Sequence, residues 1–328
     1  MKLLLIAVII IGVSALASFY MYKSTINEPL SSKDETVIIE ANKGTFSGVM
    51  LENEQMFKKP IFIKIYNKLN DVSISVKKGV YEFPSDIKLD ELLDALESGK
   101  YNTSVVRVTI PEGYTVEQIA ETLESKGILS EDNFINGVKD YTTPDYVKDD
   151  KSKRYKLEGY LFPDTYMLEN GMTAKEIIDI MIGRFEEVIS EIENENSLTL
   201  DKSKMEWYVT KASIIEREVS KADEKALVSS VIDNRLDIDM KLQIDATVLY
   251  ALGKHKEKVY LKDLKVKSPY NTYYTTGLPV GPISNPGKDS LEAAINPVES
   301  DYIYYMTKDG TNHKFFKEYK EFLKYKNS

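Results

Sequence analysis

The chain has 328 residues, enough for two domains or for one domain with an added module, and its composition is that of an ordinary globular protein. Its net charge of -9 argues against nucleic-acid binding, which requires a basic surface. It contains no cysteine and only 2 histidines, so disulfides, thiolate chemistry and a zinc site are not expected. A carboxylate site for magnesium or calcium stays open, although no calcium-loop pattern occurs; we expect no metal and no cofactor.

The N-terminus begins with an apolar run. Leu3 to Tyr22 contains no charged residue and ends in Phe19, Tyr20 and Tyr22. At about 1.5 Å per helical residue, this run reaches about 30 Å, the thickness of a bilayer core. We predict a single-pass membrane anchor over residues 1–23, with a cytoplasmic N-terminus, an extracytoplasmic remainder and a linker over residues 24–35. A signal peptide cleaved near Ala15-Leu16-Ala17 is the alternative, but the apolar run continues past that site.

Two successive segments share one pattern, a strand and two helices followed by a Gly/Tyr/Phe-Pro turn and another helix. In the first segment, residues 36–104, strands are predicted at 37–39 and 73–76 and helices at 44–51, 60–69 and 89–96. The second segment begins with a strand at 105–110 and contains the turn at 158–163 and a helix over 173–192. This weak internal repeat predicts a duplicated module.

A helical pattern from Trp207 to Ser220 carries two glutamates in different surroundings. At about 100° per residue, Glu216 falls on the apolar face beside Ala212, whereas Glu218 falls on the opposite side near Lys211. Glu218 is therefore predicted to be a solvated surface charge. Burial raises a carboxyl pKa, as a general acid near neutral pH requires, so Glu216 is the candidate acid. A purely structural pairing of Glu216 inside the protein remains open.

With thiolate and zinc chemistry excluded, carboxyl groups are the candidate catalytic groups. A glycosidase needs two carboxyl groups, and the candidates for a partner are Glu158, Asp245 and Glu218. Asp245 is favoured as a helix cap, and Glu158 as a structural or groove-lining residue before a tight turn. One acid without a partner fits a lytic transglycosylase, in which the same group protonates the glycosidic oxygen and then deprotonates the substrate's own 6-hydroxyl.

Several motifs occur in a specific order. They are residues 158–166, 212–218, 234–236, Met240, 242–243, Asp245, 270–273, 277–279, 281–283, 285–287, 293–294 and 296–297. Together they resemble the MltG/YceG family of membrane-anchored endolytic murein transglycosylases, over roughly residues 105–316 and the anchor. The resemblance departs at Val280, where the family often has proline, and after Phe316, where the usual His-Asn ending is missing; the role of His313 therefore stays open.

The resemblance implies a role for specific residues. Glu216 would be the catalytic acid and base, and a LysM-like part would lie in front of the catalytic domain. The groove residues that it implies are Glu158, Glu218, Gln243, Asp245, Tyr270, Asn271, Thr272 and Asn285.

We therefore expect an α+β protein with a transmembrane helix, an N-terminal α+β unit at 36–104, a LysM-like unit at 105–155 and a mixed α+β catalytic domain at 156–328. The expected function is endolytic cleavage of nascent peptidoglycan strands to 1,6-anhydro-muramyl ends, which would limit strand length. It would take place at the cytoplasmic membrane, beside cell-wall synthases (penicillin-binding proteins). A non-catalytic glycan-binding scaffold is the alternative, and a two-carboxylate hydrolase is the third reading.

Overall fold

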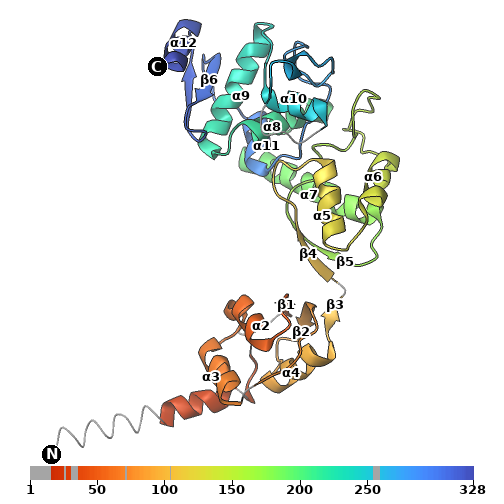
Figure 1. Ribbon diagram of the computed structural model, residues 1–328, viewed down its shortest axis with the longest axis vertical. Coiled ribbons are helices and arrows are strands. Elements are labelled where there is room, and N and C mark those ends of the chain that lie inside the picture. The colour runs from red at the N-terminus through yellow and green to blue at the C-terminus, as the bar shows by residue number, and fades with distance from the viewer. Residues whose placement is uncertain (1–15, 26, 31–35, 71, 104, 254–258) are drawn as a thin grey trace, which may run out of the picture. The chain divides into compact units, whose positions relative to one another are not determined.

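The computed structural model describes every residue except 1–15, 26, 31–35, 71, 104 and 254–258 (Figure 1). The chain divides into two compact units, with the boundary after Arg107. Most of the predicted anchor, residues 1–23, lies outside the described residues, and residues 16–25 are helical. Among the described helices, none combines the length and apolar character needed to cross a bilayer. The anchor therefore stays a prediction.

The first unit is built on a small sheet in the order β1-β2-β3. Strand β1 (Val37–Ala41) pairs antiparallel with β2 (Gly79–Phe83), and β2 pairs with β3 (Asn102–Thr103). Alternate residues of β1 are buried, as expected for a sheet with one covered face. The helical elements are α2 (Phe46–Glu52), η1 (Glu54–Met56), α3 (Pro60–Asn70) and α4 (Leu89–Ser98). The predicted strand at 73–76 is wrong, because only an isolated bridge forms there, from Ser75 to Thr45.

From β4 (Val105–Thr109), within which the boundary between the units falls, the chain shows the same order of elements as the first unit. Strand β4 is followed by α5 (Val116–Ser125), α6 (Glu131–Asp140), β5 (Thr165–Glu169) and α7 (Ala174–Glu195). Strands β4 and β5 form a two-stranded sheet. The first unit runs β1, α2, α3, β2, α4, so the predicted repeat of a strand, two helices and a further helix is present. The second strand differs from the prediction, because β2 forms in the first Gly/Tyr/Phe-Pro segment, whereas residues 158–163 form turns before β5. The LysM-like assignment remains a prediction.

The rest of the second unit is mainly helical. It contains η2 (Lys202–Lys204), α8 (Met205–Glu218), α9 (Ala222–Asp237), α10 (Asp245–Leu252), η3 (Asp263–Lys265), α11 (Lys288–Ile295), the hairpin β6 (Tyr304–Thr307) and β7 (His313–Phe316), and α12 (Tyr319–Asn327). Helix α8 packs against α9 and α11 (Figure 1). Small residues on these helices, Ala212, Ala293 and Ala294, are buried and permit a close approach. The mixed α+β class is confirmed.

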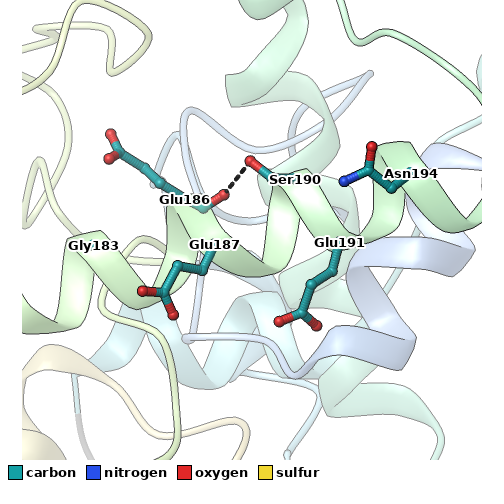
Figure 2. Close-up of a pocket in the computed structure, with 6 residues that line it drawn as sticks. All are labelled: Gly183, Glu186, Glu187, Ser190, Glu191 and Asn194. Carbon is teal, nitrogen blue, oxygen red and sulfur yellow. Dashed lines mark hydrogen bonds between the residues drawn. The ribbon is translucent and has the colours of Figure 1, made fainter.

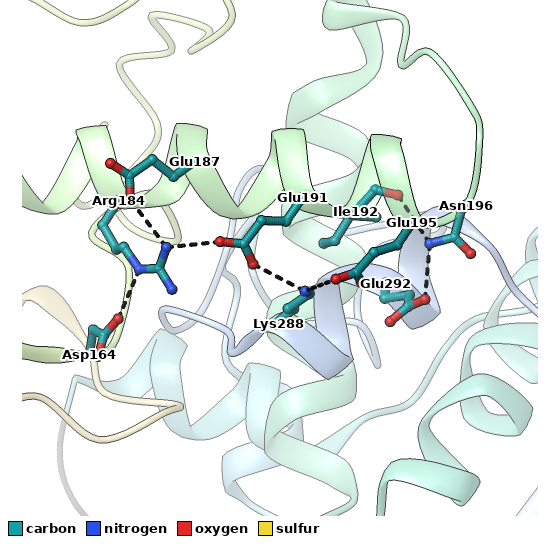
Figure 3. A network of polar contacts seen from close by, with 9 residues as sticks. All are labelled: Asp164, Arg184, Glu187, Glu191, Ile192, Glu195, Asn196, Lys288 and Glu292. Atoms are coloured by element: carbon teal, nitrogen blue, oxygen red, sulfur yellow. Dashed lines mark hydrogen bonds and ion pairs between the residues drawn. The ribbon is translucent and has the colours of Figure 1, made fainter.

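A chain of ion pairs fixes the start of α11 against α7 (Figure 3). Lys288 Nζ lies 3.1 Å from a carboxylate oxygen of Glu191 and 2.8 Å from one of Glu195. The other oxygen of Glu191 lies 3.1 Å from the guanidinium of Arg184. These groups are partly exposed, so each pair contributes little stability, but together they define the position of the α11 N-terminus.

Candidate active site

Glu216 and Glu218 both lie in the last turn of α8, but their contacts differ. Oε2 of Glu216 accepts three hydrogen bonds, from Ser290 Oγ at 2.7 Å, the Gly287 N–H at 3.1 Å and Lys225 Nζ at 3.2 Å. The Glu216 side chain is 9% exposed and that of Lys225 only 4%. The predicted inward placement of Glu216 is confirmed. Three donors, one of them the cationic Lys225, therefore surround this oxygen.

A further carboxyl group, Glu112, lies beside Glu216. A Cβ built on Gly287 would fall 1.9 Å from Glu112 Oε1, and one built on Gly113 would fall 3.5 Å from Glu216 Cγ. The pKa of Glu112 is raised, first by burial and then by the charge of Glu216, while Lys225 lowers it. The sequence analysis did not single out Glu112, because its position beside Glu216 depends on contacts between distant segments.

Glu218 has the surroundings of a proton donor. The Tyr305 hydroxyl donates to Glu218 Oε2 at 2.8 Å, and Oε1 accepts no hydrogen bond from the described residues. Burial raises the pKa of Glu218, and so does the charge of Asp245, while Tyr305, His313 and Arg235 lower it. The prediction that Glu218 is a solvated surface charge is wrong. Tyr305 belongs to the β6–β7 hairpin, which a helical wheel of α8 could not place beside this turn.

Asp245 is a second carboxylate in the surroundings of Glu218. Its Oδ1 accepts a hydrogen bond from the Tyr273 hydroxyl at 2.7 Å, and the residue is exposed. The prediction that Asp245 caps the helix is wrong, because Asp245 is the first residue inside α10. The N-cap residue of α10 is Ile244, which makes no side-chain capping bond. Gln243 is also exposed, with a left-handed φ of 52°.

Arg235 and His313 connect neighbouring elements around Glu218. Arg235 donates to the Ile303 carbonyl at 2.7 Å and to the Leu242 carbonyl at 2.6 Å. His313 Nδ1 lies 2.7 Å from Glu224 Oε2, and its ring meets that of Tyr305 edge-on at 5.8 Å. These contacts hold the hairpin against α9, and with it the Tyr305 hydroxyl.

Glu158 and Asn285 form a fully buried polar centre. Glu158 accepts hydrogen bonds from the Val116 N–H, Asn285 Nδ2 and the Tyr250 hydroxyl. Asn285 Oδ1 in turn accepts from the N–H groups of Gly159 and Leu161, both at 2.9 Å. Burial raises the pKa of Glu158 to about 8. Both residues therefore join three distant backbone segments.

Three more of the expected groove residues are also buried. Tyr270 is 5% exposed, and Asn271 and Thr272 are 0% exposed. Asn271 Nδ2 donates to the Leu264 and Val266 carbonyls, and Thr272 Oγ1 accepts from the Ile244 N–H. Of the eight expected groove residues, Glu218, Gln243 and Asp245 are at least partly exposed, whereas Glu158, Tyr270, Asn271, Thr272 and Asn285 are buried.

A separate hollow on α7 lacks these features. It is lined by Gly183, Glu186, Glu187, Ser190, Glu191 and Asn194 (Figure 2). All six come from one helix, Ser190 donates to the Glu186 carbonyl, and Glu191 is occupied by ion pairs. No group of His, Asp and Glu side chains in the described part of the chain could hold a metal ion. The candidate site is therefore the surroundings of Glu218.

The sequence from residue 38 to residue 328 matches the model of the YceG-like family. The chain belongs to the YceG-like family. It is 35% identical to the endolytic murein transglycosylase of Bacillus subtilis (strain 168), over 94% of this chain and 89% of the relative. It is 31% identical to the endolytic murein transglycosylase of Streptococcus pneumoniae serotype 2 (strain D39 / NCTC 7466), over 82% of this chain and 53% of that relative.

A solved structure shares the fold of this YceG-like chain. The crystal structure of a yceG-like protein from Listeria monocytogenes superposes with a TM-score of 0.63 at 32% sequence identity. The match covers 89% of this chain and 99% of the other. The family resemblance inferred from the ordered motifs is thus confirmed.

Proposed function

We propose that this chain is an endolytic murein transglycosylase that cleaves peptidoglycan glycan strands internally and leaves 1,6-anhydro-muramyl ends. Membership of the YceG-like family and the names of the relatives from Bacillus subtilis and Streptococcus pneumoniae support the substrate and the enzyme class. The exposed side chain of Asp245, whose charge acts on Glu218, supports a glycan-binding role for this region.

The observation that carries the mechanism is the environment of Glu218. The sequence alone favoured Glu216 as the single acid and base, but three donors, one of them cationic, surround Glu216 Oε2. A general acid must keep its proton near neutral pH, which the raised pKa of Glu218 favours. We therefore assign the proton transfers to Glu218 and give Glu216 a positioning role in the same helical turn.

In this mechanism Glu218 first donates its proton to the glycosidic oxygen as the bond from that oxygen to C1 breaks. The negative charge of nearby Asp245 favours the positive charge that develops at C1. The ionised Glu218 then accepts the proton of the 6-hydroxyl, whose oxygen forms the new bond to C1. The Tyr305 hydroxyl, 2.8 Å from Oε2, stabilises the ionised form between the two steps.

The test is mass analysis of products formed from purified glycan strands by the full chain and by Glu218→Gln and Glu216→Gln. Anhydro products, each one water lighter than a hydrolysis product, that disappear in Glu218→Gln support this mechanism. Loss in Glu216→Gln, with activity retained in Glu218→Gln, would return both proton steps to Glu216. Reducing ends would indicate a hydrolase using Glu218 and Asp245, and binding without turnover would indicate a scaffold.

We further propose that the chain is held in the cytoplasmic membrane by residues 1–23, with its second unit extracytoplasmic and beside the penicillin-binding proteins. The uncharged, mainly apolar run Leu3 to Tyr22 supports this placement. Protease added to intact spheroplasts should degrade the second unit. Protection of that unit would contradict the proposed orientation.

A further inference from the structure

Helix α3 in the first unit exposes apolar side chains. Ile63 is fully buried, yet Ile61, Ile65 and Leu69 are 64%, 41% and 71% exposed. These three residues are spaced by four, so they form one stripe along the outer side of the helix. Contiguous exposed apolar groups are typical of an interaction surface.

Lysines accompany this stripe. Lys64 and Lys68 each follow a residue of the stripe by three positions, so they lie next to it on the helix surface. Helix α3 contains no acidic residue. Lys64 pairs with Glu54 at 2.9 Å, whereas Lys58 and Lys68 are exposed and have no ion-pair partner in the part of the chain that is described. An apolar stripe with lysines at its side matches the chemistry of an anionic lipid surface.

The position of α3 within the first unit agrees with this occupant. Lys59 Nζ donates to Ser24 Oγ at 2.8 Å, and the rings of Tyr66 and Tyr22 lie 6.5 Å apart. Tyr22 and Ser24 stand at the end of the predicted anchor, where the chain would leave the bilayer. Phe19 and Tyr20 of the same segment are 58% and 74% exposed. The contacts of α3 therefore hold it next to the expected exit point.

We propose that α3 lies on an anionic bilayer, with Ile61, Ile65 and Leu69 in the boundary between headgroups and acyl chains. Its lysines contact lipid phosphates. This surface gives the first unit a second membrane contact in addition to the proposed anchor, on which the inference partly rests. It does not depend on the identity of the catalytic acid.

The absence of cysteine allows one label at a chosen site. The full chain carrying Ile65→Cys, labelled with an environment-sensitive dye, is reconstituted in vesicles of phosphatidylglycerol and phosphatidylcholine. We expect a blue-shifted emission that spin-labelled lipid quenches. The matched control is Ile38→Cys on β1 of the same unit, a residue that is 46% exposed; its label should keep an aqueous emission.

The lysines give the second arm of the test. Replacing Lys68 by glutamine should lower the ratio of docked to undocked helix about fivefold. Pure phosphatidylcholine should have a similar effect on the unmodified surface. An aqueous emission from the Ile65→Cys label in anionic vesicles overturns the proposal. Flotation of the vesicles separately shows whether the anchor has inserted. A blue shift in detergent that depends on protein concentration would instead indicate a second copy of the chain, and would also overturn it.

Discussion

Replacing Lys225 by methionine tests whether Glu216 has a structural role. The two side chains are 4% and 9% exposed, and Nζ lies 3.2 Å from Oε2. The variant leaves the Glu216 carboxylate buried, with Ser290 and Gly287 as its remaining donors. Removing one partner of a buried ion pair costs about 3 kcal/mol of unfolding free energy. For a unit of this size, we expect the melting temperature to fall by about 6–12 °C.

The double variant Glu216→Gln with Lys225→Met supplies the decisive comparison. If each single change leaves one charge unpaired, the double variant should lose less unfolding free energy than the two single variants together, by at least about 2 kcal/mol. Denaturant unfolding followed by Trp207 fluorescence measures this difference, because Trp207 is the only tryptophan and lies on α8.

A matched control is Lys175→Met, which removes an exposed pair with Asp179 and should cost under about 0.5 kcal/mol. Additive costs for the Glu216 and Lys225 changes would refute the coupling of the two side chains. Glu216 would then be free to act as the proton donor.

Two further predictions concern pH. Tyr305 lowers the pKa of Glu218 and Asp245 raises it. Tyr305→Phe should therefore move the alkaline limb of the kcat/KM profile to higher pH, and Asp245→Asn should move it to lower pH. Shifts of the two variants in the same direction would contradict the assignment of Glu218. Burial raises the folded-state pKa of Glu158 to about 8, above an unfolded value of about 4.3. Folding therefore favours the protonated form of Glu158. The contribution of this group to the unfolding free energy is complete below about pH 4.3 and is lost as pH rises to about 8. Glu158→Gln should flatten unfolding free energy over that window in denaturant titrations, whereas an unchanged slope would show that other groups cause it.

Local patterns in the sequence determined much of the fold. The spacing of apolar residues placed α7 and α8 within a few residues of their observed bounds, because burial of one helical face depends only on neighbouring residues. The same argument predicted that the side chain of Glu216 points inward. The repeated pattern of a strand and two helices predicted the shared order of those elements, and the ordered motifs indicated the family.

Contacts between distant segments decided the roles of the individual carboxyl groups. Tyr305 reaches Glu218 from 87 residues away, and Ser290 reaches Glu216 from 74 residues away. No periodicity links such positions, so a helical wheel described Glu218 as solvated and could not show what surrounds Glu216. The same limit applies to Glu158 and Asn285, which are 127 residues apart in the chain and form a direct, buried hydrogen bond. The sequence located the helix that carries both glutamates, while tertiary packing gave Glu216 three hydrogen-bond donors and placed the Tyr305 hydroxyl on Glu218.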